Sequence, residues 1–291
     1  MIGLLASVLD GLLVGAVYGL AAMGITFIWG VMDVVNLTHG AMIVAGMFGT
    51  YLLASAAGVP VYATLPLVLV GGFLAGVALY WIAVHRVIGQ PPLMSLLSTF
   101  AVNLVLVGLG TAAWGTDLFN VPASLPGFSL GRYTFPGTHL MAAVLTAVIA
   151  GALYLFLYRT RLGKAVRAVS GNREGAELVG IPTARVLALA FGLGAALACV
   201  AGMLIATMFP FTVLSGDAYL LKSFVVTVLG GLGNPTGALV AGIALGLLEG
   251  LSTPFMPVSW TLVLEFVLFV VALIAFPGGL LAIRVKRRRT R

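Results

Sequence analysis

The sequence predicts an all-α integral membrane protein, a polytopic bundle of about eight to ten transmembrane helices. Of its 291 residues, 61% are hydrophobic and 8% are charged. A soluble domain carries roughly 25% charged residues, so this chain has too few charges to cover a water-facing surface of its size. Its apolar stretches are continuous and lack the alternation of β-barrel strands, which leaves helices as the spanning elements.

Nine apolar segments are candidate spans, since about 20 residues cross a bilayer as a helix. They are roughly 4–29, 40–56, 61–84, 92–113, 138–158, 185–210, 218–232, 235–252 and 258–283. No basic residue precedes the first and no A-x-A-like site follows it, so we expect a retained helix rather than a signal peptide. The segment 218–232 is short for a full crossing and fits a tilted or re-entrant helix. The loop at 114–137 is rich in turn formers, and without larger loops we expect one transmembrane domain over 1–291.

Basic residues gather in two segments that we expect on the cytoplasmic side. They are Arg159, Arg161, Lys164, Arg167, Arg173 and Arg185 in or beside 159–184, and Arg284, Lys286, Arg287, Arg288, Arg289 and Arg291 in the tail 284–291. Clustered Lys and Arg beside spans mark the cytoplasmic face of a membrane protein. The tail directly follows a span, so its expected partner is membrane lipid and not nucleic acid. Nine spans then leave the N-terminus outside, whereas eight or ten place it inside.

Glycines recur at a spacing of four in two of the spans. The first set is Gly11, Gly15 and Gly19, and the second is Gly242, Gly246 and Gly250. This spacing lines small residues along one helix face and lets two backbones approach closely. We expect packing inside the bundle, with a dimer seam or a substrate path as the alternatives. We assign the same packing role to Gly230, Gly231, Gly233 and Gly237.

The stretch "DVVNLTHGAM" at 33–42 places Asp33, Asn36, Thr38 and His39 between two apolar spans. Polar side chains do not face lipid cheaply, so these should point into the bundle or lie at the membrane edge. We expect Asn36, His39 and Gly40 to fix a break between the first two spans, beside the translocation path. The alternative is that they only cap helix ends and hold the packing. Asn103 lies in mid-span and can hydrogen-bond between helices.

Two further carboxyl groups fall within spans. Glu265 lies about two turns into the last span, so it needs a partner or a wet cavity. Glu249 fits a position at headgroup level, and Lys222 can extend to the membrane surface.

Enzyme signatures are missing from the sequence. It contains no H-E-x-x-H, C-x-x-C or G-x-S-x-G pattern, and no G-x-x-x-x-G-K-[ST] loop for ATP. An intramembrane lipid enzyme using Asp33 and His39 is disfavoured, because these residues are not on one helix face and lack a nucleophile or metal set. We therefore expect a protein without catalytic residues, metal or cofactor.

The segment 159–184 contains a predicted helix at about 173–179. Ser170 or Asn172 can cap it, and Glu174 lies in its first turn, where the helix dipole favours an anion. Gly180 suits the position after its end, and Pro182 can open the next helix. The helix is either part of an ordinary solvated loop or a docking element for a cytoplasmic partner.

Three motifs together resemble the permeases of branched-chain amino acid ATP-binding-cassette (ABC) importers, of the LivH type. They are "VVNLTHGAM", "RLGKAVRAVSGNREGAELVGIP" and "VLGGLGNPTGALVAGIALGLLEGL", in the family's order and spread over nearly the whole chain. The resemblance implies a multi-pass permease subunit of the cell membrane that imports amino acids or a small polar solute such as an amide or urea. It implies cytoplasmic ATPase subunits, a second permease (LivM type or itself) and an extracytoplasmic solute-binding protein as partners.

On this basis we expect the ATPases to contact the 173–179 helix. Its contact core would be Glu174, Ala176, Glu177 and Gly180, with Arg167 and Arg173 as supporting charges. The alternative function is a self-sufficient secondary transporter or channel, which the lack of an evident acidic ion site deep in the bundle disfavours.

Overall fold

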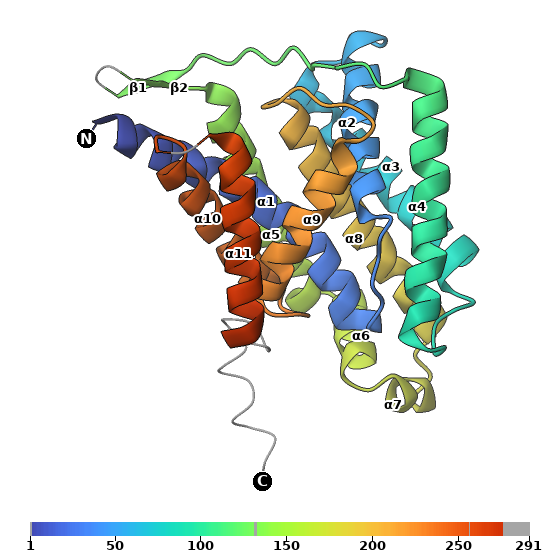
Figure 1. Ribbon diagram of the computed structural model, residues 1–291. Coiled ribbons are helices and arrows are strands. Elements are labelled where there is room, and N and C mark those ends of the chain that lie inside the picture. Colours follow the sequence, from blue (N-terminus) through green and yellow to red (C-terminus); the bar gives the residue numbers. More distant parts are fainter. Residues whose placement is uncertain (1, 131–132, 256, 276–291) are drawn as a thin grey trace.

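The computed structural model describes residues 2–130, 133–255 and 257–275, which form a helical bundle (Figure 1). The long helices are α1 (Ile2–Met32), α2 (His39–Ser55), α3 (Leu65–Leu79), α4 (Pro92–Trp114), α5 (Gly137–Arg159), α8 (Thr183–Ala206), α9 (Ser215–Gly230), α10 (Pro235–Ser252) and α11 (Val258–Ala275). The shorter elements are the 3₁₀-helix η1 (Val61–Thr64), the π-helix η2 (Tyr80–Val84), α6 (Arg161–Gly171), α7 (Arg173–Leu178), β1 (Phe128–Leu130) and β2 (Tyr133–Phe135).

Each predicted span corresponds to one long helix, so the all-α membrane class is confirmed. Among the described residues, six helices are long and apolar enough to cross a membrane, and α2 is a shorter apolar helix. The loop 114–137 differs from the expectation of turns alone, because β1 and β2 pair antiparallel in it with Phe128 opposite Phe135. The basic tail 284–291 lies outside the described residues.

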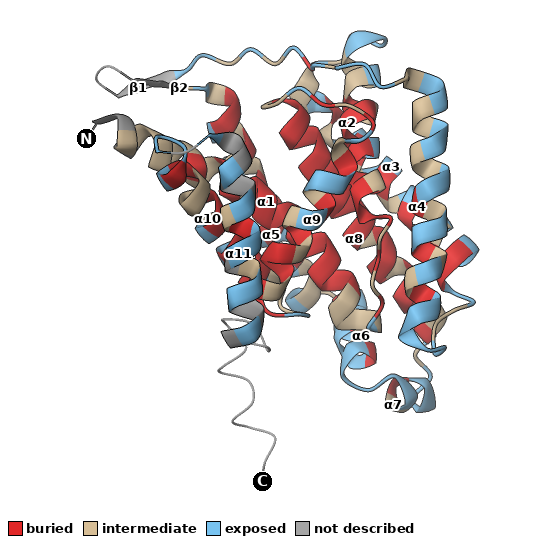
Figure 2. Cartoon of the chain, viewed as in Figure 1, coloured by how far each residue is buried: buried red, intermediate tan, exposed pale blue. Residues whose placement is uncertain are grey.

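Helix α8 is the centre of the bundle. It packs against α1, α2 and α3, and from Ala195 to Ala206 every residue is buried. A helix that is apolar on all sides belongs inside other helices. Figure 2 shows the consequence, with buried residues on α1, α2 and α8 and exposed ones on the outer α4 and α11.

The two glycine faces meet each other within this chain. A Cβ atom at Gly15 would lie 2.6 Å from the carbonyl oxygen of Gly242 and 2.9 Å from the Cα of Gly246, and one at Gly11 would overlap the carbonyl oxygen of Gly246. Real Cβ atoms essentially never come that close, so α1 and α10 touch backbone to backbone. The turn between α9 and α10 is equally tight, because a Cβ at Gly230 would lie 2.5 Å from the backbone of Ala238.

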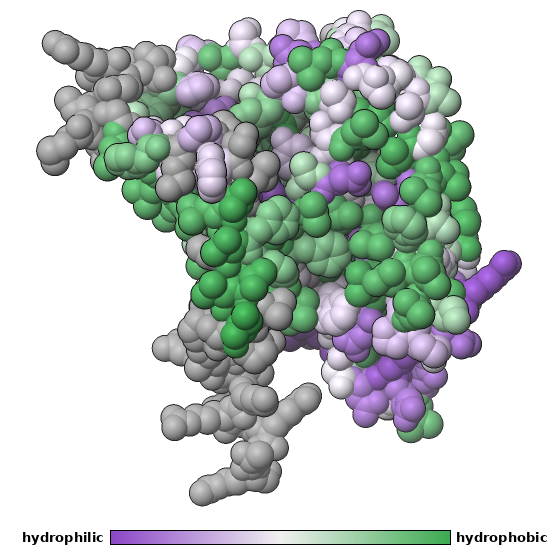
Figure 3. Space-filling model, in the orientation of Figure 1, coloured by the Kyte–Doolittle hydropathy of each residue, from purple (hydrophilic) through white to green (hydrophobic). Residues whose placement is uncertain are grey.

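The outer surface carries the apolar belt that a bilayer requires. Figure 3 shows hydrophobic side chains across the middle of the face formed by α4, α9 and α11, and a hydrophilic end around α6 and α7. Exposed residues such as Leu74, Leu109 and Val148 belong to helices that span this belt. Such a patch is far larger than those on soluble proteins, so the chain is a multi-pass membrane protein.

Candidate translocation and coupling sites

The chain breaks after α1 and turns back into the bundle. The amide of Asp33 donates to the carbonyl of Trp29 (2.9 Å), Asp33 has a φ of 52°, and residues 33–38 lie outside any helix. His39 then begins α2, with its Nε2 atom 2.9 Å from the carbonyl oxygen of Ala21. Ala21 lies three turns before the end of α1, about 16 Å at 1.5 Å per residue. Helix α2 therefore begins inside the bundle and not at the membrane edge.

Side chains hold the backbone of this break. The amide of Leu37 donates to Thr99 Oγ1 of α4 (3.2 Å), and Thr99 Oγ1 lies 3.1 Å from the carbonyl oxygen of Val35. The carbonyl of Ser95, 3.0 Å away in α4, competes for the single hydroxyl hydrogen of Thr99. Asn36 Oδ1 accepts from both the amide (3.1 Å) and the hydroxyl (2.5 Å) of Thr38. A non-helical segment at membrane depth needs such partners, because neither lipid nor a helix satisfies its amides and carbonyls.

Two buried polar atoms remain at the break, the donor Asn36 Nδ2 and, because Nε2 carries the ring hydrogen toward a carbonyl, the acceptor His39 Nδ1. Asn36 is 1% exposed and His39 is 0% exposed, and Asn36 Nδ2 and His39 Nδ1 have no hydrogen-bond partner among the described residues. Gly40 lies beside them, against the carbonyl of Gly216 at the start of α9. Asn103 is buried one turn beyond Thr99, on the same side of α4. The structure thus brings Asn36, His39 and Gly40 together and places Asn103 on the adjoining helix.

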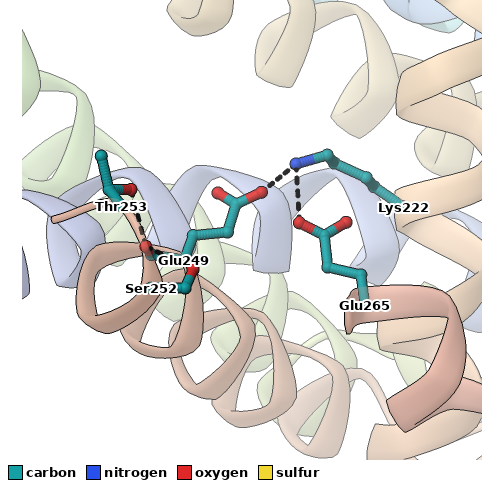
Figure 4. Close-up of polar contacts among 5 residues, drawn as sticks. All are labelled: Lys222, Glu249, Ser252, Thr253 and Glu265. Carbon is teal, nitrogen blue, oxygen red and sulfur yellow. Dashed lines mark hydrogen bonds and ion pairs between the residues drawn. The ribbon is translucent and has the colours of Figure 1, made fainter. Parts of the chain in front are cut away.

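A separate charged cluster joins α9, α10 and α11 (Figure 4). The ammonium of Lys222 pairs with Glu249 and, at 3.2 Å, with Glu265, and it lies 4.6 Å from the ring centre of Tyr18. The side chain of Glu265 is 3% exposed, so the predicted need for a partner is met by Lys222. The expectation that Lys222 extends to the membrane surface is wrong, because two carboxylates hold it inside. Glu249 likewise has a protein partner and does not rely on headgroups.

Helices α6 and α7 form the hydrophilic end of the molecule. Thr160 caps α6 by accepting from the amide of Gly163 (2.9 Å), and Asn172 caps α7 by accepting from that of Gly175 (2.8 Å). Of the two predicted caps, Asn172 is the one used, while Ser170 donates to the carbonyl of Gly30 (2.5 Å) in α1. Gly180 has a φ of 82°, as a residue after a helix end requires.

Helix α6 was not predicted from the sequence. Its signals are modest: Thr160 as a cap, and the buried residues Gly163, Val166 and Val169 at a spacing of three. These signals lie among five basic residues of the 159–173 segment, which made a solvated loop the simpler interpretation.

The predicted coupling residues occupy two sides of α6 and α7. Ala176 is 4% exposed and packs inward, Glu177 accepts from the Thr183 hydroxyl (2.5 Å), and Arg167 donates to the carbonyl of Leu157 (3.1 Å). Arg173 pairs with Glu177 (3.5 Å). Arg167 therefore joins α6 to α5 and Glu177 joins α7 to α8, while Glu174 and Gly180 are exposed.

Sequence reasoning missed the most exposed apolar side chains of this end. Leu178 is 88% exposed and Val179 is 76% exposed, at the tip of α7. In the sequence they resemble core residues, because nothing there distinguishes an apolar residue that faces outward at a helix end.

Comparison with known proteins places the chain in one family. Residues 7–273 match the family model for the permease component of branched-chain amino acid transport systems. The chain is 28% identical to the high-affinity branched-chain amino acid permease LivH of Salmonella typhimurium and to BraD of Pseudomonas aeruginosa, with 95% of each chain covered. It is 26% identical to a probable LivH of Methanocaldococcus jannaschii over 92% of this chain and 89% of that one. No solved structure gives a significant match. The chain belongs to the family of permease components of branched-chain amino acid transport systems.

Proposed function

We propose that this chain is the membrane-spanning subunit of an ABC importer that carries branched-chain amino acids into the cytoplasm. ATP is hydrolysed on separate cytoplasmic subunits, a solute-binding protein delivers the amino acid from outside, and a second permease of the LivM type or a second copy completes the pore. The family match over residues 7–273 and the names of the relatives support this proposal. The α6–α7 end and the C-terminal tail then face the cytoplasm, as their basic residues favour.

The observation that carries the coupling role is the exposed tip of α7. Leu178 and Val179 are exposed at the end of α7, and α7 belongs to the hydrophilic end of the molecule (Figure 3). Two adjacent apolar side chains that are this exposed to water favour a protein partner. Glu174 adds a charge on the same short helix. We assign the ATPase contact to Glu174, Leu178, Val179 and Gly180. The residues that hold α6 and α7 in position for this contact are Arg167, Arg173, Ala176 and Glu177.

A connected set of contacts leads from α7 to the break. Asn172 ends α6 and caps α7, so the two helices share a residue. Ser170 of α6 donates to Gly30 near the end of α1, and the break begins three residues later at Asp33. A movement of α7 toward the membrane would therefore press on the end of α1.

The break is the part of the bundle that we assign to the translocation path. Asn36 Nδ2 is a buried donor and His39 Nδ1 a buried acceptor, both without a partner in the described structure, and such groups cost free energy unless a ligand or water meets them. A carboxylate oxygen of the passing amino acid suits the donor Asn36 Nδ2, and its ammonium group suits the acceptor His39 Nδ1. Gly40 and Asn103 border the same region and complete the proposed path.

Affinity purification of the full-length chain from its native membrane tests the coupling site. Wild type is compared with Leu178→Glu/Val179→Glu and with Leu118→Glu, a residue 71% exposed in the loop 114–137. We expect ATPase subunits to accompany wild type and the Leu118→Glu control, and to be lost from the double variant. If ATPases accompany all three equally, the docking site is wrong. If none accompanies the intact wild type, a self-sufficient transporter or channel replaces the importer.

A further inference from the structure

A hollow of about 790 Å³ lies between the end of α5 and the turn that precedes α10. Its walls are Met23 of α1, Leu239 of α10, residues 231–236 of the turn, and Ala147, Ala150, Gly151, Leu153, Tyr154, Leu157 and Tyr158 of α5. Its volume is within the range of small-molecule sites. None of the residues assigned to the break or to the tip of α7 contributes to it.

One side of the hollow opens toward the bilayer. Gly151, Tyr154 and Tyr158 are exposed, and they belong to the same spanning helix as the exposed Val148 and Leu155. Most of the remaining wall is apolar. A hydrocarbon chain from the surrounding lipid reaches such a hollow without crossing water.

The other side of the hollow carries a cationic lip. The guanidinium of Arg167 lies 4.6 Å from the ring centre of Tyr158 and its Nε donates to the carbonyl of Leu157, and both partners line the hollow. Nε is the one nitrogen of Arg167 that is hydrogen-bonded within the described structure. The two terminal nitrogens of the guanidinium group are therefore available to bind a ligand. Arg159, Arg161 and Lys164 lie nearby in the chain, and residues 137–171 contain no Asp or Glu.

We propose that this hollow binds one anionic phospholipid, with an acyl chain along α5 and the phosphate at Arg167. Tyrosines near the end of a span lie at headgroup depth, and arginine pairs well with phosphate oxygens. Positive charge without any acidic residue suits a phosphate better than the mixed surface of a second protein subunit. Because Arg167 belongs to α6, the bound headgroup also fixes the helix that leads to α7.

The test fills the hollow without disturbing the bundle. A Cβ at Gly151 meets no other atom within 4 Å, so Gly151→Leu projects into the open groove. Gly108→Leu is the matched control, because Gly108 on the lipid-facing α4 is open in the same way. Arg167→Gln removes the charge at the lip while keeping a polar side chain.

Each full-length variant is purified in mild detergent, and binding of phosphatidylglycerol and phosphatidylcholine is titrated by native mass spectrometry. We expect wild type and Gly108→Leu to hold one phosphatidylglycerol, and Arg167→Gln to bind it about tenfold more weakly, as loss of a charge-assisted contact predicts. Gly151→Leu should also bind it more weakly, because the added side chain occupies the hollow. Equal binding of the two lipids, or unchanged binding by Gly151→Leu, overturns the proposal. Loss of a second permease from Gly151→Leu with lipid binding intact identifies the hollow as a subunit interface instead.

Discussion

Gly46 of α2 and Cys199 of α8 mark a close approach between two helices at the centre of the molecule. A Cβ at Gly46 would overlap the carbonyl group of Cys199 and lie 2.6 Å from its Cα. The thiol of Cys199 donates to the carbonyl of Met42, one turn earlier in α2 (3.1 Å). Cys199 is therefore a packing residue, and a single methyl group on α2 has no room.

We expect Gly46→Ala to destabilise the protein by about 1–3 kcal/mol, because an overpacked core must push α2 and α8 apart. Gly49→Ala, on the same helix, is the control, since a Cβ there meets nothing within 4 Å. The free energy of unfolding in detergent, measured by denaturant titration, separates the two. Equal stabilities would show that α2 and α8 adjust freely around the added methyl.

The contact of a single residue can be predicted from the sequence when that residue belongs to a repeating pattern. The spacing of four in Gly11, Gly15 and Gly19 is visible in the sequence, and these residues do lie against α10. Gly46 belongs to no such series, so its contact was invisible. The polar stretch at Asn36 and His39 stands out against apolar neighbours, yet its unpartnered atoms follow only from the positions of Ala21 and Thr99.

The break before α2 is an element in its own right, and Thr99 holds it from outside. Thr99→Val removes the acceptor for the amide of Leu37 and the hydroxyl beside the carbonyl of Val35. We expect a loss of about 1–3 kcal/mol, the cost of buried backbone groups without partners. Thr111→Val is the control on the same helix, because its hydroxyl donates only to the carbonyl of Val107 within α4 (2.9 Å).

Hydrogen exchange at the backbone amides of the break tests this prediction locally. The amide of Leu37 should exchange faster in Thr99→Val and remain protected in Thr111→Val. Unchanged exchange would mean that the break is rigid without α4.

Helices could be predicted from the sequence where hydrophobicity alone determines where they form. All the predicted spans appear as helices, and α7 follows from its cap and its glycine. The depth at which α2 begins was not predictable, because an apolar run of 17 residues is compatible with several positions in a bilayer. That depth is fixed by contacts with α1 and α4, which are distant in sequence.

At the scale of the whole molecule, the charged cluster of Lys222, Glu249 and Glu265 ties three successive helices together (Figure 4). In the described structure α11 contacts only α9 and α10 substantially, so Glu265 is a main polar tether of this helix. Both carboxyl groups were visible in the sequence, Glu265 as one that needs a partner and Glu249 as one that fits headgroup level. Their common partner was not, because 27 and 43 residues separate Lys222 from the two glutamates.

Lys222→Met should therefore destabilise the protein by about 3–5 kcal/mol, because two buried carboxyl groups lose their partner. Lys222→Met/Glu249→Gln/Glu265→Gln should recover much of that loss, since neutral side chains of similar volume replace all three charges. Lys164→Met, at an exposed position of α6, controls for the loss of a positive charge alone. Thermal unfolding in detergent ranks the variants. A triple variant as unstable as Lys222→Met would mean that the lysine acts through its packing on Tyr18, and that the charges do not hold α11 to the bundle.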